Sequence, residues 1–317
     1  MIVPSAEAQV PAIHVPLMDQ AEAYAKASKA GNTVKAYSSD WQSFCSFCQG
    51  EGVSPLPAAP QTVAAWVASM AGSMAAATIR RRLASVSQAH KLAGLDSPTS
   101  SEAVKSTFKG VLRVHGSQQR KAAPVRAKNL RRLVADAPET AKDARDLALI
   151  LLGFFGAFRR SELVALDVED LAFTEEGVTV NIRRSKTDQQ GKGRTIGVPA
   201  APGSAGCPVK ALRAHLEASG QTSGPLFRRS NRWGQAGERL AAESVADILK
   251  AKAEGMGLDP AQVSGHSLRR GFVTEAYASG AETPEIQAVS GHKSIQVLAG
   301  YYQEANVFKN ASARIRL

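Results

Sequence analysis

Residues 265–272 read Gly-His-Ser-Leu-Arg-Arg-Gly-Phe, and residues 290–302 read Ser-Gly-His-Lys-Ser-Ile-Gln-Val-Leu-Ala-Gly-Tyr-Tyr. His266 and Arg269 are three residues apart, so on a helix they share one face and could approach a single anion. A guanidinium can give a phosphate two hydrogen bonds, and an imidazole can move a proton near neutral pH. The hydroxyl of Tyr301 could attack phosphorus if basic groups stabilise its phenolate. Taken singly, the first stretch could also be a surface turn, and the tyrosines could be packing residues.

A second candidate follows the longest apolar run of the chain, Leu147–Phe158. Its 12 residues are too few for a bilayer, which needs roughly 20. A helix that is apolar on every side is typically buried, so Arg159 at its end is costly unless it meets an anion. Arg160 points about 100° away on a helical path and can reach solvent. The simpler alternative is a structural ion pair between Arg159 and Glu162 at i+3.

Hydrophobic periodicity predicts a mostly α fold with a small antiparallel sheet, that is, an α+β protein. Helices are expected from about residue 32, over residues 63–70, 79–91, 103–115, 129–135 and 143–158, and from about residues 208, 242 and 267. Strands are expected at residues 167–173, 178–182 and 195–199, and they make the only clear sheet. Lys186 then lies at the tip of the second strand. It could belong to a solvated hairpin, and Lys192 and Arg194 compete for any role there.

Charge is distributed unevenly along the 317 residues, which carry 39 Lys and Arg against 28 Asp and Glu. Residues 78–126 alone hold ten Lys and Arg and two Asp and Glu. A basic block inside a folded region makes a polyanion a reasonable partner. We expect a flexible arm at residues 1–18, a helical domain at 19–115, a linker at 116–128, and a second domain at 129–317 that ends in a tail helix.

Composition excludes several classes of protein. The chain is 44% hydrophobic and 21% charged, which is ordinary for a globular protein. Three cysteines cannot form a disulfide framework and fit a reducing cytoplasm, and we expect no secretory signal and no membrane span. Cys45 and Cys48 have metal-like spacing, but they lie on an amphipathic helix without a second pair. Without a carboxylate cluster or a Gly-rich phosphate loop, we expect no metal, ATP or other cofactor.

The segments occur together in a known order. The pattern Arg…Lys…His-x-x-Arg…Gly-His…Tyr, with nine residues from His292 to Tyr301, resembles the tyrosine recombinase (phage integrase) family. The amino-terminal half is similar to the core-binding domain of Cre-like members, through Thr33-Val-Lys35, Ala-Ala-Trp66-Val and Ala77-Thr-Ile-Arg-Arg-Arg-Leu83. Two positions depart from the pattern. His292 stands where Cre-like members have tryptophan, and Arg270 stands where the family often has histidine.

The resemblance implies a two-domain clamp around duplex DNA, with a helical core-binding domain and a catalytic domain. Matching positions assign the catalytic roles: Arg159 and Arg269 grip the scissile phosphate, Glu162 supports Arg159, His266 acts as acid or base, Lys186 protonates the leaving 5′ oxygen, His292 donates to a phosphoryl oxygen, and Tyr301 attacks. For DNA binding it points to Lys35, Arg80, Arg81 and Lys91. Such residues either read bases or only contact phosphates, and both alternatives stay open.

The sequence therefore predicts a site-specific DNA recombinase that works through a 3′-phosphotyrosyl intermediate. The resemblance implies a homodimer on inverted-repeat half-sites and a homotetramer in synapsis. In Cre-like members the tail docks on the adjacent protomer; here Phe308, Ala311 and Ile315 form an apolar stripe that could also pack on its own domain. The alternatives are a type IB topoisomerase and a catalytically silent DNA-binding protein of the same fold.

Overall fold

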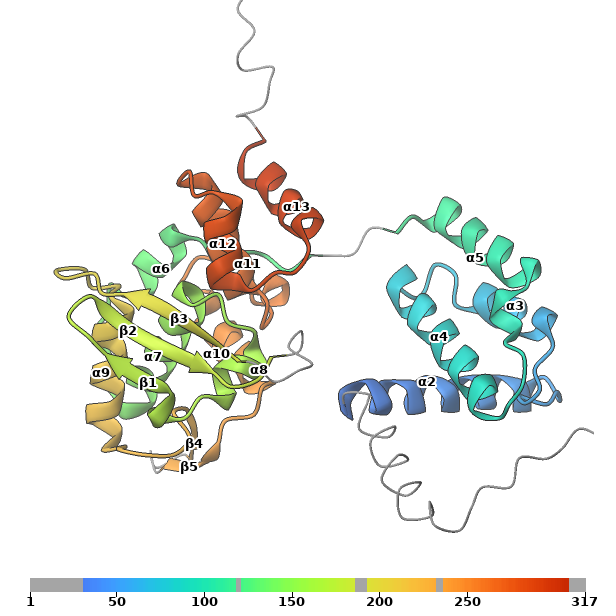
Figure 1. Cartoon of the computed structure of the whole chain (residues 1–317), viewed down its shortest axis with the longest axis horizontal. Helices are drawn as coiled ribbons and strands as arrows, with labels where there is room; N and C mark the ends of the chain where they lie inside the picture. The colour runs from blue at the N-terminus through green and yellow to red at the C-terminus, as the bar shows by residue number, and fades with distance from the viewer. Residues whose placement is uncertain (1–30, 118–120, 186–192, 232–235, 308–317) are drawn as a thin grey trace, which may run out of the picture. The chain divides into compact units, whose positions relative to one another are not determined.

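The computed structural model describes residues 31–117, 121–185, 193–231 and 236–307 (Figure 1). The chain divides into two units, residues 1–120 and 121–317, and this boundary lies inside the predicted linker of residues 116–128. The predicted arm at residues 1–18 and the tail beyond Val307 lie outside the described residues. The functions assigned to the two domains remain predictions.

Helices with one apolar face build the first unit. They are α2 (Gly31–Gly50), α3 (Pro60–Ser69), α4 (Ala76–Leu92) and α5 (Glu102–His115), with a short 3-10 turn, η2 (Pro98–Ser100), before α5. The predicted inward faces are buried, among them Phe44 of α2, Trp66 of α3 and Ile79 of α4. The rings of Phe44 and Trp66 lie 4.8 Å apart at the centre of this core. The four predicted helices are confirmed.

The second unit is built around a buried helix, α7 (Ala141–Phe155). Around it lie α6 (Ala127–Leu133), α8 (Arg160–Ala165), α9 (Pro208–Ser219), α10 (Ser244–Ala253), the 3-10 turn η4 (Pro260–Gln262), α11 (Ser267–Ala278), α12 (Thr283–Ser290) and α13 (Ile295–Ala305). The last two helices were not predicted. The all-apolar helix is buried as expected, but it ends at Phe155 and not at Phe158.

A sharp turn after Phe155 explains the shorter helix. Phe158 folds back over the turn, and a Cβ at Gly156 would lie 2.0 Å from its ring, so only glycine fits there. Ala157 has φ 47°, the left-handed region. The chain thus leaves α7 before Arg159, which begins α8 as its N-cap residue. The expectation that Arg159 ends the apolar helix was wrong for this reason.

A three-stranded antiparallel sheet packs on this core in the order β1 (Leu171–Phe173), β2 (Gly177–Ile182), β3 (Arg194–Pro199). The predicted first strand is shorter, because residues 168–170 form a 3-10 turn, η3, whose Asp170 carboxylate accepts from the Asp167 backbone N–H at 2.8 Å. The structure also has a second sheet, β4 (Arg228–Ser230) and β5 (Ala236–Arg239), which the sequence did not predict.

The fold class is confirmed as mostly helical with small antiparallel sheets. None of the helices in the described ranges is long and apolar enough to cross a membrane.

Candidate active site

Arg159 and Glu162 form an ion pair at the start of α8. The Glu162 carboxylate accepts from the Arg159 backbone N–H at 3.0 Å and from Arg159 Nη1 at 2.5 Å. The Glu162 side chain is 1% exposed and that of Arg159 is 16% exposed, whereas Arg160 is 43% exposed. The ion pair expected from the i+3 spacing is present, and the two arginines diverge as predicted. A buried carboxylate that both caps the helix and pairs with Arg159 fixes that guanidinium in place.

Arg269 lies in the first turn of α11 and is buried. Its Nη1 donates to the carbonyl oxygen of Ala157 at 2.7 Å, while its Nη2 is buried with no hydrogen-bond partner among the described residues. Burial, followed by the positive charge of Arg159, lowers the pKa of Arg269 to about 10. An arginine stays protonated near neutral pH even so, and a buried cation with an unused donor is the arrangement an anion would complete.

His292 follows the C-terminus of α12, where Gly291 adopts φ 63°. Its Nδ1 lies 2.7 Å from the hydroxyl of Ser290, which is buried. Burial, followed by the charges of Arg269 and Arg159, lowers the pKa of His292 to about 4. The imidazole is therefore neutral at physiological pH. If the Ser290 hydroxyl donates to Nδ1, the ring proton sits on Nε2, which can then donate to a ligand.

The two neighbouring tyrosines of α13 differ in their surroundings. Tyr301 is half-buried, its ring centroid is 6.2 Å from that of His292, and the Arg270 guanidinium lies 5.9 Å from its ring centre. Tyr302 is 52% exposed and packs edge-on against Tyr277 at 5.3 Å. The phenol that belongs to the cationic cluster is that of Tyr301.

Arg194, the first residue of β3, also belongs to this cluster, although the sequence indicated it only as a competitor of Lys186. Its Nη1 donates to the carbonyl of Val289 at 2.6 Å, and its Nη2 lies 3.4 Å from the Glu162 carboxylate. Burial, and secondarily Arg159, lowers the pKa of Arg194. Arg194 therefore ties β3 to the helix of Arg159 and to the end of α12. No local pattern marks such a residue, because long-range contacts create its role.

The roles of two predicted catalytic residues, Lys186 and His266, remain predictions. Lys186 lies outside the described residues, as does its competitor Lys192. His266 is the N-cap residue of α11 and is exposed, one turn before Arg269, and its backbone N–H donates to the Ser264 hydroxyl at 3.2 Å. His266 and Arg269 therefore both lie at the start of α11, three residues apart, as the sequence predicted.

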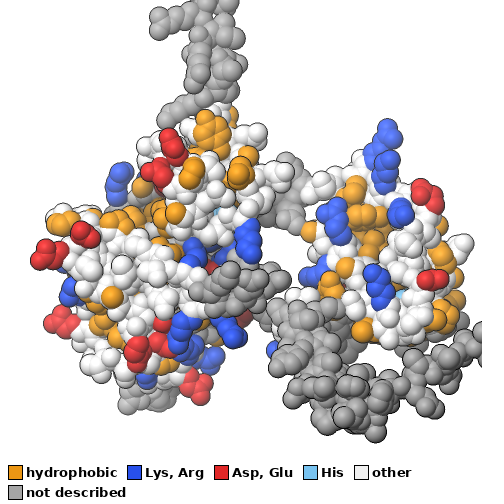
Figure 2. Space-filling view, viewed as in Figure 1, with side chains coloured by type: hydrophobic (Ala, Val, Ile, Leu, Met, Phe, Trp, Pro, Cys, Tyr) orange, Lys and Arg blue, Asp and Glu red, His pale blue; other side chains and the backbone are white. Residues whose placement is uncertain are grey.

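The residues predicted to bind DNA lie on α2 and α4, and their side chains are exposed. Figure 2 shows that Lys and Arg side chains prevail over Asp and Glu on the displayed face of this unit. Arg80 packs over the ring of Phe108 at 5.6 Å, whereas Lys35 and Lys91 extend from the helix surface. Arg81 differs, because its guanidinium makes two hydrogen bonds to Asp40, at 2.7 and 3.0 Å. Arg81 therefore links α4 to α2.

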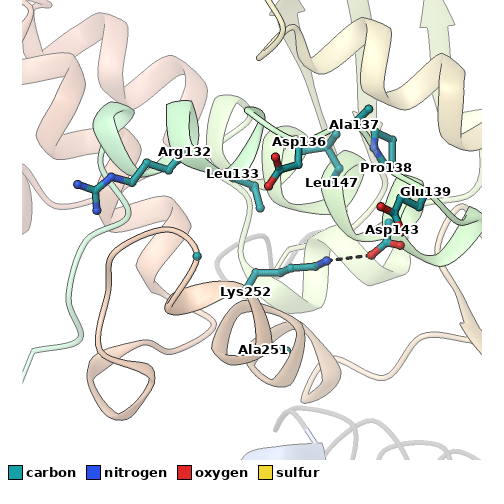
Figure 3. A pocket seen from close by; sticks show the side chains of 11 residues that line it. Arg132, Leu133, Asp136, Ala137, Pro138, Glu139, Asp143, Leu147, Ala251 and Lys252 are labelled. Carbon is teal, nitrogen blue, oxygen red and sulfur yellow. Dashed lines mark hydrogen bonds and ion pairs between the residues drawn. The ribbon is translucent and has the colours of Figure 1, made fainter.

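One cavity of the second unit lies apart from this cluster. A cavity of about 320 Å³ between α6, α7 and α10 contains the Asp143–Lys252 ion pair of 2.9 Å (Figure 3), and its lining includes none of the residues described above. Within the described ranges, no three His, Cys, Asp or Glu side chains gather as a metal site would require. Burial raises the pKa of the Cys45 and Cys48 thiols, which disfavours the thiolates that bind metals.

A family model described as the phage integrase family matches residues 124–307. The chain belongs to this family. It is 39% identical over 289 residues to an integrase/recombinase xerD homolog of Selenomonas ruminantium, covering 89% of this chain and 84% of the relative. It is 24% identical over 307 residues to the Cre recombinase of Escherichia phage P1, covering 90% and 87%. The relatives are tyrosine recombinases, which confirms the predicted family and enzyme class.

A solved structure supports the fold. The XerH site-specific recombinase, bound to a palindromic difH substrate in a post-cleavage complex, superposes with a TM-score of 0.60 at 19% identity, covering 81% of this chain and 72% of that one. The resemblance to Cre-like members holds across most of the chain, but the xerD homolog is the more similar of the two relatives.

Proposed function

We propose that this phage integrase family member is a site-specific recombinase that cleaves and rejoins duplex DNA through a 3′-phosphotyrosyl ester, without metal or ATP. The observation that carries the proposal is the unpaired, buried Nη2 of Arg269, in a cluster that also holds Arg159, His292 and Tyr301. Several cations around one phenol suit a phosphodiester, because attack builds negative charge on its non-bridging oxygens.

The proposed step balances as a transesterification. The Tyr301 oxygen attacks phosphorus, the bond to the 5′ oxygen breaks, and Lys186 gives that oxygen a proton. Arg159 and Arg269 hold the non-bridging oxygens, with Glu162 fixing Arg159, and His292 donates from Nε2. His266 takes the phenol proton. Since the ester retains the bond energy, the reverse reaction rejoins DNA without ATP.

DNA binding is proposed from the charge of the chain and from its relatives. The basic residues 78–126 and the exposed Lys35, Arg80 and Lys91 would supply phosphate or base contacts. We further propose a clamp of two domains, a homodimer on inverted half-sites and a synaptic homotetramer. The tail stripe that would link protomers lies outside the described residues.

A nicked suicide substrate tests the chemistry. The DNA would be a segment that the protein protects in footprinting, nicked so that the cleaved fragment diffuses away. Wild-type protein and Tyr302→Phe should form a covalent adduct, and Tyr301→Phe should not, while binding within about three-fold of wild type since only one hydroxyl is lost. An inactive Tyr302→Phe with an active Tyr301→Phe would move the nucleophile.

The footprinted DNA segment also distinguishes the proposed recombinase from the two alternative functions. A recombinase exchanges strands between two copies of the protected site, whereas a type IB topoisomerase only relaxes supercoiled DNA. A silent DNA-binding protein would give a footprint without any adduct.

A further inference from the structure

The helix that carries Tyr301 has a single charged residue. Residues 295–305, which form α13, contain no Lys, Arg or Asp, and their one Glu is Glu304. The helix packs against α11 and α12 (Figure 1) through a small apolar core of Val273, Tyr277, Ile286 and Leu298. Its outer face is exposed, with Ile295 at 63%. So small a core leaves the position of α13 sensitive to its polar contacts.

Glu304 meets Arg270, the residue directly after Arg269. Arg270 Nη2 lies 2.5 Å from both carboxylate oxygens of Glu304. The Arg270 side chain is 10% exposed and that of Glu304 is 34% exposed. Burying an unpaired charge costs much more free energy than burying a paired one. The Glu304 carboxylate therefore offsets the cost of burying the Arg270 guanidinium.

The same guanidinium lies 5.9 Å from the centre of the Tyr301 ring. Glu304 is three residues after Tyr301, so on the helix both side chains are directed to one face, which meets α11. On α11, Arg269 is held in turn by the Ala157 carbonyl. Because Arg269 and Arg270 are consecutive residues of α11, the helix that carries the proposed phosphate ligand also holds the helix of the proposed nucleophile.

We propose that the Arg270–Glu304 pair is a latch that positions Tyr301 for attack by fixing α13 on α11. Arg270 is then a positioning residue that Glu304 holds through Nη2, while the buried Nε of Arg270 has no hydrogen-bond partner among the described residues. The inference rests on the proposed function, in which Tyr301 is the nucleophile. It predicts that losing either partner slows cleavage without weakening DNA binding.

The test compares Glu304→Gln, Arg270→Gln and the double variant in single-turnover adduct formation at saturating nicked substrate. Each single variant should cleave at least about ten-fold more slowly, because a misplaced nucleophile loses its near-attack geometry. The double variant should be no slower than the slower single one, since the two residues act as a unit. Arg270→Lys, which keeps a cation for Glu304, should retain more activity than Arg270→Gln.

Hydrogen exchange supplies a readout that does not depend on chemistry. Amides of residues 295–305 should exchange faster in Glu304→Gln, while those of α7 stay unchanged. Glu275→Gln is the matched control, because it removes the Arg126–Glu275 ion pair from the same helix α11 without touching α13. It should leave both the adduct rate and the exchange of α13 as in wild type.

The outcomes are distinguishable. A wild-type rate in Glu304→Gln, multiplied losses in the double variant, or an equal loss in Glu275→Gln would overturn the latch. If wild-type protein itself forms no adduct, the proposed function is wrong. Hydrogen exchange of α13 in Glu304→Gln would still test whether the Arg270–Glu304 pair fixes that helix. Unchanged exchange in Glu304→Gln would overturn the latch independently.

Discussion

The Nη1 of Arg269 donates to the carbonyl oxygen of Ala157 at 2.7 Å, and Ala157 reaches that position with φ 47°. A non-glycine residue in the left-handed region costs about 1–2 kcal/mol. The turn after α7 thus holds a strained residue whose carbonyl orients a buried guanidinium. Strain at such a place is typical of a functional site.

Substitutions at Ala157 test this relationship. Ala157→Gly should leave stability within about 1 kcal/mol, because relief of strain offsets the added freedom of the unfolded chain. Ala157→Val should lose about 1–3 kcal/mol, since a β-branched residue is poorly tolerated there, and should cleave more slowly because the distorted turn moves the backbone carbonyl that accepts from Arg269. Urea denaturation and single-turnover adduct formation measure both effects. If the two variants have the same stability and the same cleavage rate, the backbone strain at Ala157 plays no part in orienting Arg269.

Arg194 is expected to be needed for cleavage although it was not predicted as catalytic. Arg194→Ala removes donors to Glu162 and to the Val289 carbonyl, which should destabilise the fold by about 1–3 kcal/mol and slow adduct formation. Gly291→Ala should have a similar effect, because its Cβ would lie 2.8 Å from the Arg194 guanidinium. Arg213→Ala, which removes an exposed cation stacked on Phe173, is the control. If all three variants cleave alike, Arg194 has no role in the site.

Hydrophobic periodicity predicted the helices whose one face is buried, because Ile79 and Val86 repeat at helical spacing and fill the core. It missed β4 and β5, whose residues Arg228–Ser230 and Ala236–Arg239 have no apolar alternation. It also extended β1 too far, since Asp170 caps Asp167 through a polar contact that periodicity does not report.

In the site, too, sequence patterns predicted some residues and missed others. The family order of motifs identified Arg159, Arg269, His292 and Tyr301, which the fold brings together. Arg194 was named only as a competitor of Lys186 and Glu304 was not named at all, because their roles arise from partners far along the chain. For Glu304 a signal did exist, as the only charge in an otherwise uncharged helix.

The Asp40–Arg81 pair joins α2 to α4, the two helices proposed to face DNA. Asp40 is buried, and the hydrogen bond from Arg81 to its carboxylate raises the pKa of that guanidinium. Asp40→Asn should therefore destabilise the first unit by about 1–3 kcal/mol. Arg81→Ala should weaken DNA binding mainly through this loss of order. Arg80→Ala and Lys91→Ala should weaken binding with little change in stability and lower its salt dependence. Filter binding at several salt concentrations, with thermal unfolding, distinguishes the two patterns.

The general acid is expected to be Lys186, with Lys192 as the alternative. Lys186→Ala should cleave natural DNA slowly and recover on a 5′-bridging phosphorothiolate, because the sulfur leaves without a proton. Lys192→Ala should cleave both substrates at similar rates. Rescue of Lys192→Ala alone would transfer the role to that residue.

His292 is expected to make stability depend on pH. Its pKa is about 4 in the folded chain, against about 6.5 when unfolded. Between these values the unfolded chain binds a proton that the folded chain excludes, so stability present above pH 6.5 is lost as the pH falls toward 4. Allowing for partial exposure, the loss should be about 2 kcal/mol. His292→Gln should lack this component. The lowered pKa of buried His215 acts in the same direction but is common to both proteins, so it cancels. Urea denaturation of the full chain at pH 7.5 and pH 4.5 measures the difference, and an identical pH response in His292→Gln would show that the imidazole is not held neutral by the arginine cluster.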